Sequence, residues 1–197
     1  MSAPVLVLYY SRHGSTLTMA KKIAQGIEQQ GLEARLRTVP EVSTNIDSQQ
    51  SSVPESGDPY VTQQDLLDCC ALALGSPTRF GNMAAPLKYF LDETSAQWLA
   101  GALENKPACV FTSTSSMHGG QESTLLTMMI PLLHHGMIIC GLPYSNPQLH
   151  TTVTGGSPYG VTHLSQGMPA NKLSEEEQAL CIQQGKRLAM FASKLEK

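Results

Sequence analysis

Hydroxyl side chains and a glycine are concentrated in residues 9–16, which read Y-Y-S-R-H-G-S-T. The apolar run at 5–8 predicts a buried strand before them, and the helical spacing of apolar residues after them predicts a helix. A helix N-terminus that follows a strand can bind an anion through its N–H groups, and Gly14 lets the backbone come close to such a ligand. The stretch therefore predicts either a phosphate-binding loop or, as the plainer alternative, a helix cap.

Common phosphate-binding motifs do not match this loop. It lacks the Gly-Lys-Ser/Thr end of a P-loop and the G-x-G-x-x-G of a dinucleotide-binding turn. A receiver domain needs acidic residues at the end of its first strand, where this chain has Tyr9, Tyr10 and Ser11. A terminal monophosphate remains. It carries about −1.5 to −2 charges, and each hydrogen bond to a charged group contributes roughly 1.5–3 kcal/mol, so four or five donors can hold it without a lysine.

Two later segments have a similar composition, S-P-T-R-F-G-N at 76–82 and S-T-S-S-M-H-G-G at 113–120. Each follows an apolar run that is typical of a buried strand. Ligands of open α/β sheets bind beyond the carboxyl ends of the strands, so we expect the three loops to surround one ligand. Their shared location favours the phosphate-binding interpretation over the helix cap.

Alternating apolar runs and helical patterns predict the elements that must position these loops. Strands are expected at about 5–8, 33–39, 71–75, 108–112 and 137–141. Helices are expected after the first strand up to Gly31, at 84–94, at 121–135 and from 174 onward. The last helix begins with a capping box and should bury one face, formed by Cys181, Leu188, Ala192 and Leu195. The fold class is α/β, a doubly wound five-stranded parallel sheet with helices on both faces.

Length and composition predict a single domain over 1–197, with a polar insertion at about 40–64 and an extended loop at about 143–173. The formal net charge of −3 gives no basic surface, so nucleic acid is not an expected partner. No apolar run is long enough for a membrane span or a signal peptide. The five cysteines form no C-x-x-C pair, which predicts reduced thiols and a cytoplasmic location.

Taken together, four motifs resemble the WrbA family of flavodoxin-like NAD(P)H:quinone oxidoreductases, which bind FMN and are tetrameric. They are V-L-V-L-Y-Y-S-R-H-G-S-T, G-S-P-T-R-F-G-N-M, F-T-S-T-S-S-M-H-G-G-Q-E and L-L-H-H-G-M. The resemblance extends through G-G-S-P-Y-G at 155–160 and covers nearly the whole chain. It implies a homotetramer with FMN as cofactor and with NAD(P)H and quinones as substrates.

The resemblance also implies roles for individual residues. The FMN phosphate would lie against Ser11, Arg12, His13, Gly14, Ser15 and Thr16. The flavin ring would lie beside Thr78, Arg79 and Phe80 on one edge, and on the other beside Ser113, Thr114, Ser115, Ser116, Met117, His118 and Gly119. His134 would also touch the cofactor, His13 would contact the nicotinamide, and Trp98 would form the quinone pocket across a subunit boundary.

No metal site is expected, because His134 and His135 are adjacent and would point about 100° apart on a helix. The hypothesis for the activity is ping-pong hydride transfer from NADH or NADPH through FMN to a quinone, which receives two electrons. One alternative is a one-electron carrier like flavodoxin, against which the weak charge, the extra segments and Trp98 argue. Another is a non-catalytic flavin-binding protein that interacts with a partner. The sequence does not choose between NADH and NADPH, nor does it identify a proton donor.

Overall fold

A parallel sheet forms the centre of the computed structural model, which describes residues 2–43, 54–166, 169 and 172–195. Five strands run in the order β2-β1-β3-β4-β5, and a sixth, β6, pairs with β4. Their bounds are β1 Val5–Tyr9, β2 Ala34–Thr38, β3 Ala71–Pro77, β4 Pro107–Thr114, β5 Ile138–Ile139 and β6 Val161–Leu164. Every pairing is parallel, so the predicted doubly wound parallel sheet is confirmed.

The predicted count of five strands is one too few, because β6 lies inside the extended loop expected at 143–173. β5 pairs with the start of β4 and β6 pairs with its end, so both short strands occupy the same edge. The backbone N–H groups of Val161 and Leu164 donate to side chains of the last helix, to Gln184 Oε1 at 2.6 Å and Glu177 Oε1 at 3.0 Å. The four residues of β6 are too few to show a clear periodicity, and the strand is stabilised by side chains that are distant in the sequence.

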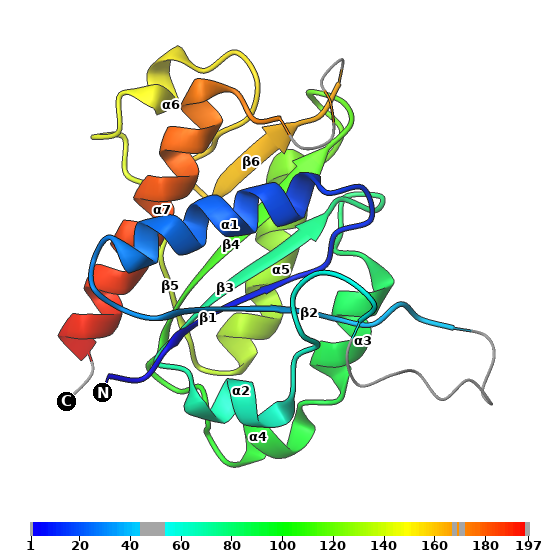
Figure 1. Cartoon of the computed structure of the whole chain (residues 1–197), viewed down its shortest axis with the longest axis vertical. Coiled ribbons are helices and arrows are strands. Elements are labelled where there is room, and N and C mark those ends of the chain that lie inside the picture. Colours follow the sequence, from blue (N-terminus) through cyan, green and yellow to red (C-terminus); the bar gives the residue numbers. More distant parts are fainter. Residues whose placement is uncertain (1, 44–53, 167–168, 170–171, 196–197) are drawn as a thin grey trace.

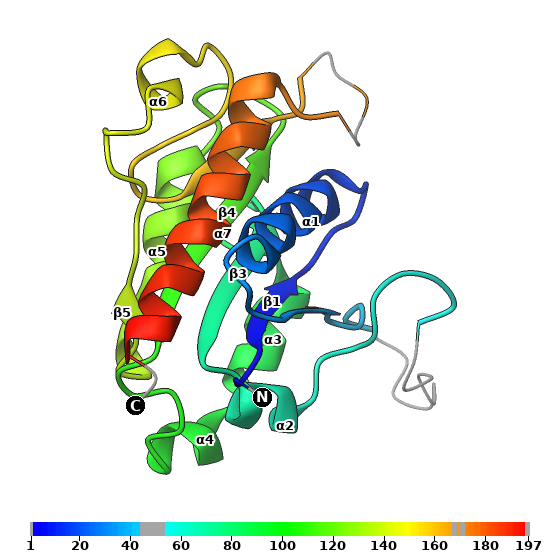
Figure 2. The same cartoon turned by 60° about the vertical axis from the view of Figure 1, so that its left-hand side comes forward.

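Helices cover both faces of the sheet, as predicted. Helices α1 (Ser15–Glu28) and α7 (Glu175–Leu195) pack on one face, against the cluster that contains Val5 and Val7. Helices α3 (Ala85–Asp92) and α5 (Gln121–His134) pack on the other, against the cluster that contains Leu6 and Leu8. This alternation along β1 follows from the two-residue period of a strand. Figures 1 and 2 show the layers from two directions.

Three short helices were not predicted, namely α2 (Gln63–Asp68), α4 (Ser95–Leu99) and α6 (Gln148–Thr151). Each has at most six residues, too few for an apolar period to be recognised. Helix α5 continues through Pro131 to His134, so the proline does not shorten it. Among the described residues, none of the helices is both long and apolar enough to cross a membrane.

The predicted start of α7 is confirmed. The backbone N–H of Glu177 donates to Ser174 Oγ at 3.1 Å, and the backbone N–H of Ser174 donates to Glu177 Oε2 at 3.0 Å, which completes the capping box. Of the expected buried face, Cys181, Leu188 and Ala192 are buried. The prediction for Leu195 is wrong, because its side chain is 44% exposed at the end of the helix, beyond the core cluster.

The polar insertion lies partly outside the described residues, which omit 44–53. The part after the gap is fixed beside β2, since the Thr38 N–H donates to the Pro59 carbonyl at 3.0 Å and the Val61 N–H donates to the Thr38 carbonyl at 2.8 Å. Tyr9 Oη donates to Asp58 Oδ2 at 2.7 Å. This end of the insertion is therefore attached to the sheet.

Candidate functional site

A pocket of about 300 Å³ lies at the carboxyl ends of β1, β3 and β4. Its lining comes from the three predicted loops together with one residue beyond β6, and consists of Ser11, Arg12, His13, Ser15, Thr16, Pro77, Thr78, Arg79, Ser113, Thr114, Ser115 and Ser165. Figure 1 shows the loops at the same end of the sheet. The expectation that the three loops surround one site agrees with this geometry.

The first loop leaves the N-terminus of α1 open toward the pocket. Gly14 is the N-cap residue, it has φ +93°, and no side chain caps the helix. The Gly14 N–H donates to Ser11 Oγ at 3.1 Å, and this bond closes the loop on itself. An uncapped helix N-terminus carries a partial positive charge and N–H donors, and both favour an anion. The donor set of hydroxyls, amides and one arginine therefore fits a phosphate group.

Hydroxyl groups connect the loops behind the pocket. Thr16 Oγ1 and Ser113 Oγ lie 3.1 Å apart and are buried, joining the first loop to the third. Thr78 Oγ1 and Thr124 Oγ1 lie 2.7 Å apart and join the second loop to α5. The Ala84 N–H donates to Ser76 Oγ at 2.8 Å and holds the end of the second loop. These bonds fix the relative positions of the three loops.

The second loop ends in a tight turn that exposes an aromatic ring. The Arg79 N–H donates to the Asn82 carbonyl at 2.7 Å, and the Asn82 N–H donates to the Arg79 carbonyl at 3.0 Å. Between them, Phe80 has φ +53° and is fully exposed. A bulky residue in the left-handed region is uncommon, and such strain is concentrated at functional sites. Phe80 stands outside the pocket lining, as a flat apolar surface beside it.

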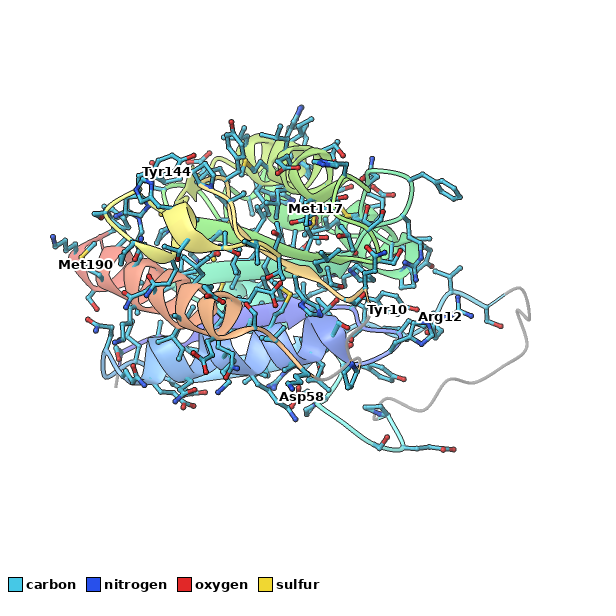
Figure 3. All side chains as sticks on the ribbon, turned by 90° about the horizontal axis from the view of Figure 1, so that it is seen from above. Tyr10, Arg12, Asp58, Met117, Tyr144 and Met190 are labelled. Carbon is cyan, nitrogen blue, oxygen red and sulfur yellow. The ribbon has the colours of Figure 1, made fainter. Side chains whose placement is uncertain are left out.

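Only the first half of the third loop lines the pocket. Ser113, Thr114 and Ser115 do so, whereas the predicted contacts Ser116, Met117, His118 and Gly119 lie outside its lining. These four are exposed, in a turn in which the Gly119 N–H donates to the Ser116 carbonyl at 3.1 Å. Figure 3 labels Met117, which is 46% exposed. The turn therefore stands at the rim.

Sequence reasoning missed Ser165 because it missed β6. The Ser165 N–H and Oγ both donate to the Thr114 carbonyl, at 2.8 and 2.9 Å, and bring the end of β6 to the rim. One feature of the sequence could have indicated it. Ser165 directly follows a short run that begins with valine, as Ser11 does in the first loop.

Trp98 and His134 lie in a different hollow. Trp98 Nε1 donates to the His134 carbonyl at 2.8 Å. The hollow has a volume of about 440 Å³ and is lined by Lys88, Leu91, Asp92, Thr94, Ser95, Trp98, Ile130, Pro131, His134 and His135. Helix α5 begins beside the second loop and ends at His134, a distance of about 20 Å at 1.5 Å per residue. Figures 1 and 2 show α4, which carries Trp98, at the end of the molecule opposite the loop after β4. One protomer therefore does not bring these two residues to its own pocket.

The adjacent histidines face different surroundings. His134 is exposed, whereas His135 is buried and its Nε2 lies 3.0 Å from Thr94 Oγ1. Burial lowers the pKa of His135, and His134 acts in the same direction. Within the described part of the chain, no group of three or more histidine, cysteine or carboxylate side chains is arranged to hold a metal ion.

Positive charge gathers near the pocket. Burial, together with the hydrogen bond to Glu41, raises the pKa of Tyr10 to about 12, although the positive charges of Arg12 and Arg79 act to lower it. Both guanidinium groups are thus close enough to influence the phenol. Among the described residues, neither Arg12 nor Arg79 forms an ion pair with a carboxylate.

Comparisons with known proteins agree with this geometry. Residues 4–146 match the family described as NADPH-dependent FMN reductase. A protein of Solidesulfovibrio magneticus named NAD(P)H dehydrogenase (quinone) is 41% identical over 199 residues, which cover 97% of this chain and 98% of the relative. A flavodoxin, WrbA-like protein from Agrobacterium tumefaciens has a TM-score of 0.72 at 22% identity, over 98% of this chain and 99% of that one. An archaeal flavodoxin has a TM-score of 0.62 at 19% identity, over 98% and 99%.

Proposed function

The chain belongs to the NADPH-dependent FMN reductase family, and from this premise we propose that it is an FMN-dependent NAD(P)H:quinone oxidoreductase that transfers two electrons by a ping-pong mechanism. The near full-length relative named NAD(P)H dehydrogenase (quinone) supports quinones as the acceptors. The observation that carries the proposal is the open N-terminus of α1, which faces three loops rich in hydroxyl groups.

FMN fits the pocket at its phosphate end. The hydroxyls of Ser11, Ser15 and Thr16, the N–H groups at the start of α1 and the guanidinium of Arg12 would hold the phosphate. Bound there, FMN would supply two-electron chemistry, in which a hydride from NAD(P)H is delivered, with a proton, to a quinone. A charge-assisted hydrogen bond contributes roughly 1.5–3 kcal/mol, so this donor set suffices without a lysine.

The loops would orient the flavin ring. Thr78 and Arg79 lie on one side of the pocket and Ser115 on the other, so that a ring seated above the phosphate would lie between the second and third loops. The exposed ring of Phe80 offers an apolar flank. Met117, in the third loop, has an exposed side chain, and His13, which lines the pocket, would contact the nicotinamide.

A homotetramer would complete the substrate pocket. Leu126, Ile130 and Leu133 are each about half exposed, at 46%, 54% and 58%. Their spacing of four and three residues places them on one face of α5, and an apolar patch of this kind favours association. Because Trp98 and His134 lie about 20 Å from their own pocket, they would reach the flavin of a neighbouring protomer.

Anaerobic visible spectroscopy tests the proposal. The protein is loaded with FMN and titrated with NADH or NADPH, and then with a quinone. We expect one equivalent of nucleotide to bleach the flavin fully, and one equivalent of quinone to restore it after the oxidised nucleotide has been removed. Parallel lines in double-reciprocal plots would support the ping-pong order.

The same experiment separates the alternative functions. Flavin that binds but stays oxidised with both nucleotides would contradict the proposal and favour a one-electron carrier. Protein that does not bind FMN would contradict the proposal and favour an interaction protein that acts without flavin. Reoxidation of the flavin by quinone that requires the oxidised nucleotide to remain bound would contradict the ping-pong order alone.

A further inference from the structure

A hollow of about 510 Å³, distinct from the hollow of Trp98, adjoins the cofactor pocket on the side of β2 and α3, and we call it the second hollow. The two spaces share Arg12 and Arg79, which line both. Tyr10 and Glu41 form one side of the second hollow, and the first turns of α3 up to Lys88 form the other. Figure 3 shows Tyr10 and Arg12 close together at one end of the molecule. A ligand in the second hollow would therefore lie beside FMN bound in the cofactor pocket.

The hollow is positively charged. Its lining includes three basic residues, Arg12, Arg79 and Lys88, and one acidic residue, Glu41, which leaves an excess of two positive charges. Glu41 Oε1 accepts a hydrogen bond from Tyr10 Oη at 2.6 Å, so this carboxylate is already engaged. Arg79 Nη1 donates to the Thr78 carbonyl at 2.7 Å. The guanidinium groups can therefore still bind an anion.

Lys88 can also turn toward an anion. Its Nζ lies 2.5 Å from Asp92 Oδ1, one helical turn away, and both side chains are more than half exposed. An exposed pair of this kind contributes little, and the flexible lysine stem can reach another partner. Lys88 borders the second hollow but not the cofactor pocket, so its charge reports on the second hollow rather than on FMN.

We propose that the second hollow binds the 2′-phosphate of NADPH, with Arg12 and Lys88 as its ligands. This inference rests on the proposed function, because it places the adenosine half of the nucleotide beside the flavin that the nicotinamide would reach. A 2′-phosphate carries about −1.5 to −2 charges, which matches the excess of two positive charges in the lining. In the dinucleotide sites of Rossmann folds, a carboxylate binds the hydroxyl groups of an unmodified ribose, whereas an arginine binds a 2′-phosphate. Here the carboxylate of Glu41 is engaged by Tyr10. Arg12 lines both spaces, and its five N–H donors suffice for the FMN phosphate and for a second anion.

Apolar residues in the same lining suit the adenine base. Val42, Met83, Ala84, Ala85 and Pro86 contribute side chains to the hollow. Adenine-containing ligands are commonly seated on apolar surface and oriented by a few polar groups. The hollow therefore combines a surface for the base with cations for the phosphate.

Calorimetric binding of 2′,5′-ADP and 5′-AMP to the FMN-saturated protein tests the proposal. The two ligands differ only in the 2′-phosphate, so the ratio of their dissociation constants isolates this group. We expect the wild-type protein to bind 2′,5′-ADP at least tenfold more tightly than 5′-AMP. Lys88→Gln and Arg12→Gln should each reduce this preference to about threefold or less, while Lys194→Gln, an exposed charge on α7, should preserve it.

Equal binding of the two ligands by the wild-type protein would overturn the proposal. So would a preference that survives in both Lys88→Gln and Arg12→Gln. If these variants weaken the binding of 2′,5′-ADP and 5′-AMP equally, the basic side chains contact the 5′-phosphate, and the assignment is wrong. Lys88 is exposed, and an unchanged unfolding midpoint would establish that its variant folds.

Flavin reduction distinguishes failure of this site from failure of the proposed function. Equal kcat/KM for NADPH and NADH would overturn the 2′-phosphate site and leave the oxidoreductase in place. Tight binding of 2′,5′-ADP without flavin reduction by either nucleotide would overturn the oxidoreductase and leave the phosphate site. A drop in the NADPH to NADH ratio of kcat/KM in Lys88→Gln would support both.

Discussion

The hydroxyl groups of Thr16 and Ser113 lie 3.1 Å apart in the protein interior, although 97 residues separate them in the chain. Thr16 belongs to the first turn of α1, and Ser113 lies near the end of β4. The contact therefore joins two parts of the cofactor pocket's wall. Both side chains line that pocket, so each can also face bound FMN.

Removing either hydroxyl should weaken FMN binding. Thr16→Val deletes a donor to the phosphate, Ser113→Ala deletes a hydroxyl beside the flavin, and each loosens the joint between two loops. We expect the dissociation constant for FMN to rise about tenfold, because one hydrogen bond to a charged group contributes roughly 1.5–3 kcal/mol. Quenching of flavin fluorescence measures the affinity. Ser193→Ala, an exposed change on α7, is the control, and an affinity within twofold of wild type in both variants would contradict the assignment.

Gly14 should tolerate asparagine better than alanine. Its φ of +93° lies in the left-handed region, although a Cβ atom would meet no other atom within 4 Å. An alanine there costs about 1–2 kcal/mol, while asparagine adopts this conformation more readily. Urea unfolding of the FMN-free protein should place Gly14→Asn between wild type and Gly14→Ala. Equal stability of the two variants would show that backbone conformation does not limit this position.

The carboxylate of Glu177 should stabilise the fold in a pH-dependent manner. Burial raises its pKa, but hydrogen bonds from His163, Leu164 and Ser174 outweigh burial, and the pKa is lowered overall. The ionised form is therefore favoured in the folded state. Its contribution is complete above the unfolded pKa of about 4.3, and is lost as the pH falls through the lower folded value.

Glu177→Gln should destabilise the protein by roughly 1.5–3 kcal/mol at pH 7, the contribution of a hydrogen bond to a charged group. Urea unfolding at pH 7, 5 and 3.5 gives the difference from wild type, which should be constant between the first two values and smaller at the third. Glu175→Gln changes an exposed carboxylate in the same turn and serves as the control. A difference that grows as the pH falls would contradict the direction of the shift.

Charge on the exposed face of α5 should disrupt assembly without removing FMN. Leu126 is 46% exposed and borders neither the cofactor pocket nor the hollow of Trp98. In Leu126→Asp we expect the tetramer to dissociate, because a buried unpaired carboxylate is unfavourable at an interface. Quinone reduction should fall with it, since Trp98 of a neighbouring protomer would be lost from the site.

Light scattering after size-exclusion chromatography measures the assembly of Leu126→Asp, and fluorescence titration measures its FMN affinity. Val153→Asp, at a side chain that is 80% exposed between α6 and β6, is the matched control. A Leu126→Asp protein that remains tetrameric would exclude this face as the interface. A wild-type protein that is monomeric and active would contradict the shared site.

Local sequence patterns were sufficient for most of the sheet and for the loops. Val5–Leu8 is a continuous apolar run, and the loop that follows it contains Ser11 and Thr16, so strand and loop could both be predicted. β6 could not be predicted, because its backbone N–H groups donate to the side chains of Gln184 and Glu177. Both residues belong to α7, which begins more than ten residues after β6 ends. Ser165 was missed for the same reason.

The sequence by itself determined five of the six parallel strands and indicated that three loops rich in hydroxyl groups meet beyond their ends. These features depend on periodicity and on residue types within a few positions of each other. Only the tertiary structure decided that Trp98 and His134 lie about 20 Å from the pocket, at the far end of α5. Only it placed Lys88 in one hollow with Arg12. The direction and length of packed helices fix such distances. Contacts between distant parts of the chain set that direction and that length.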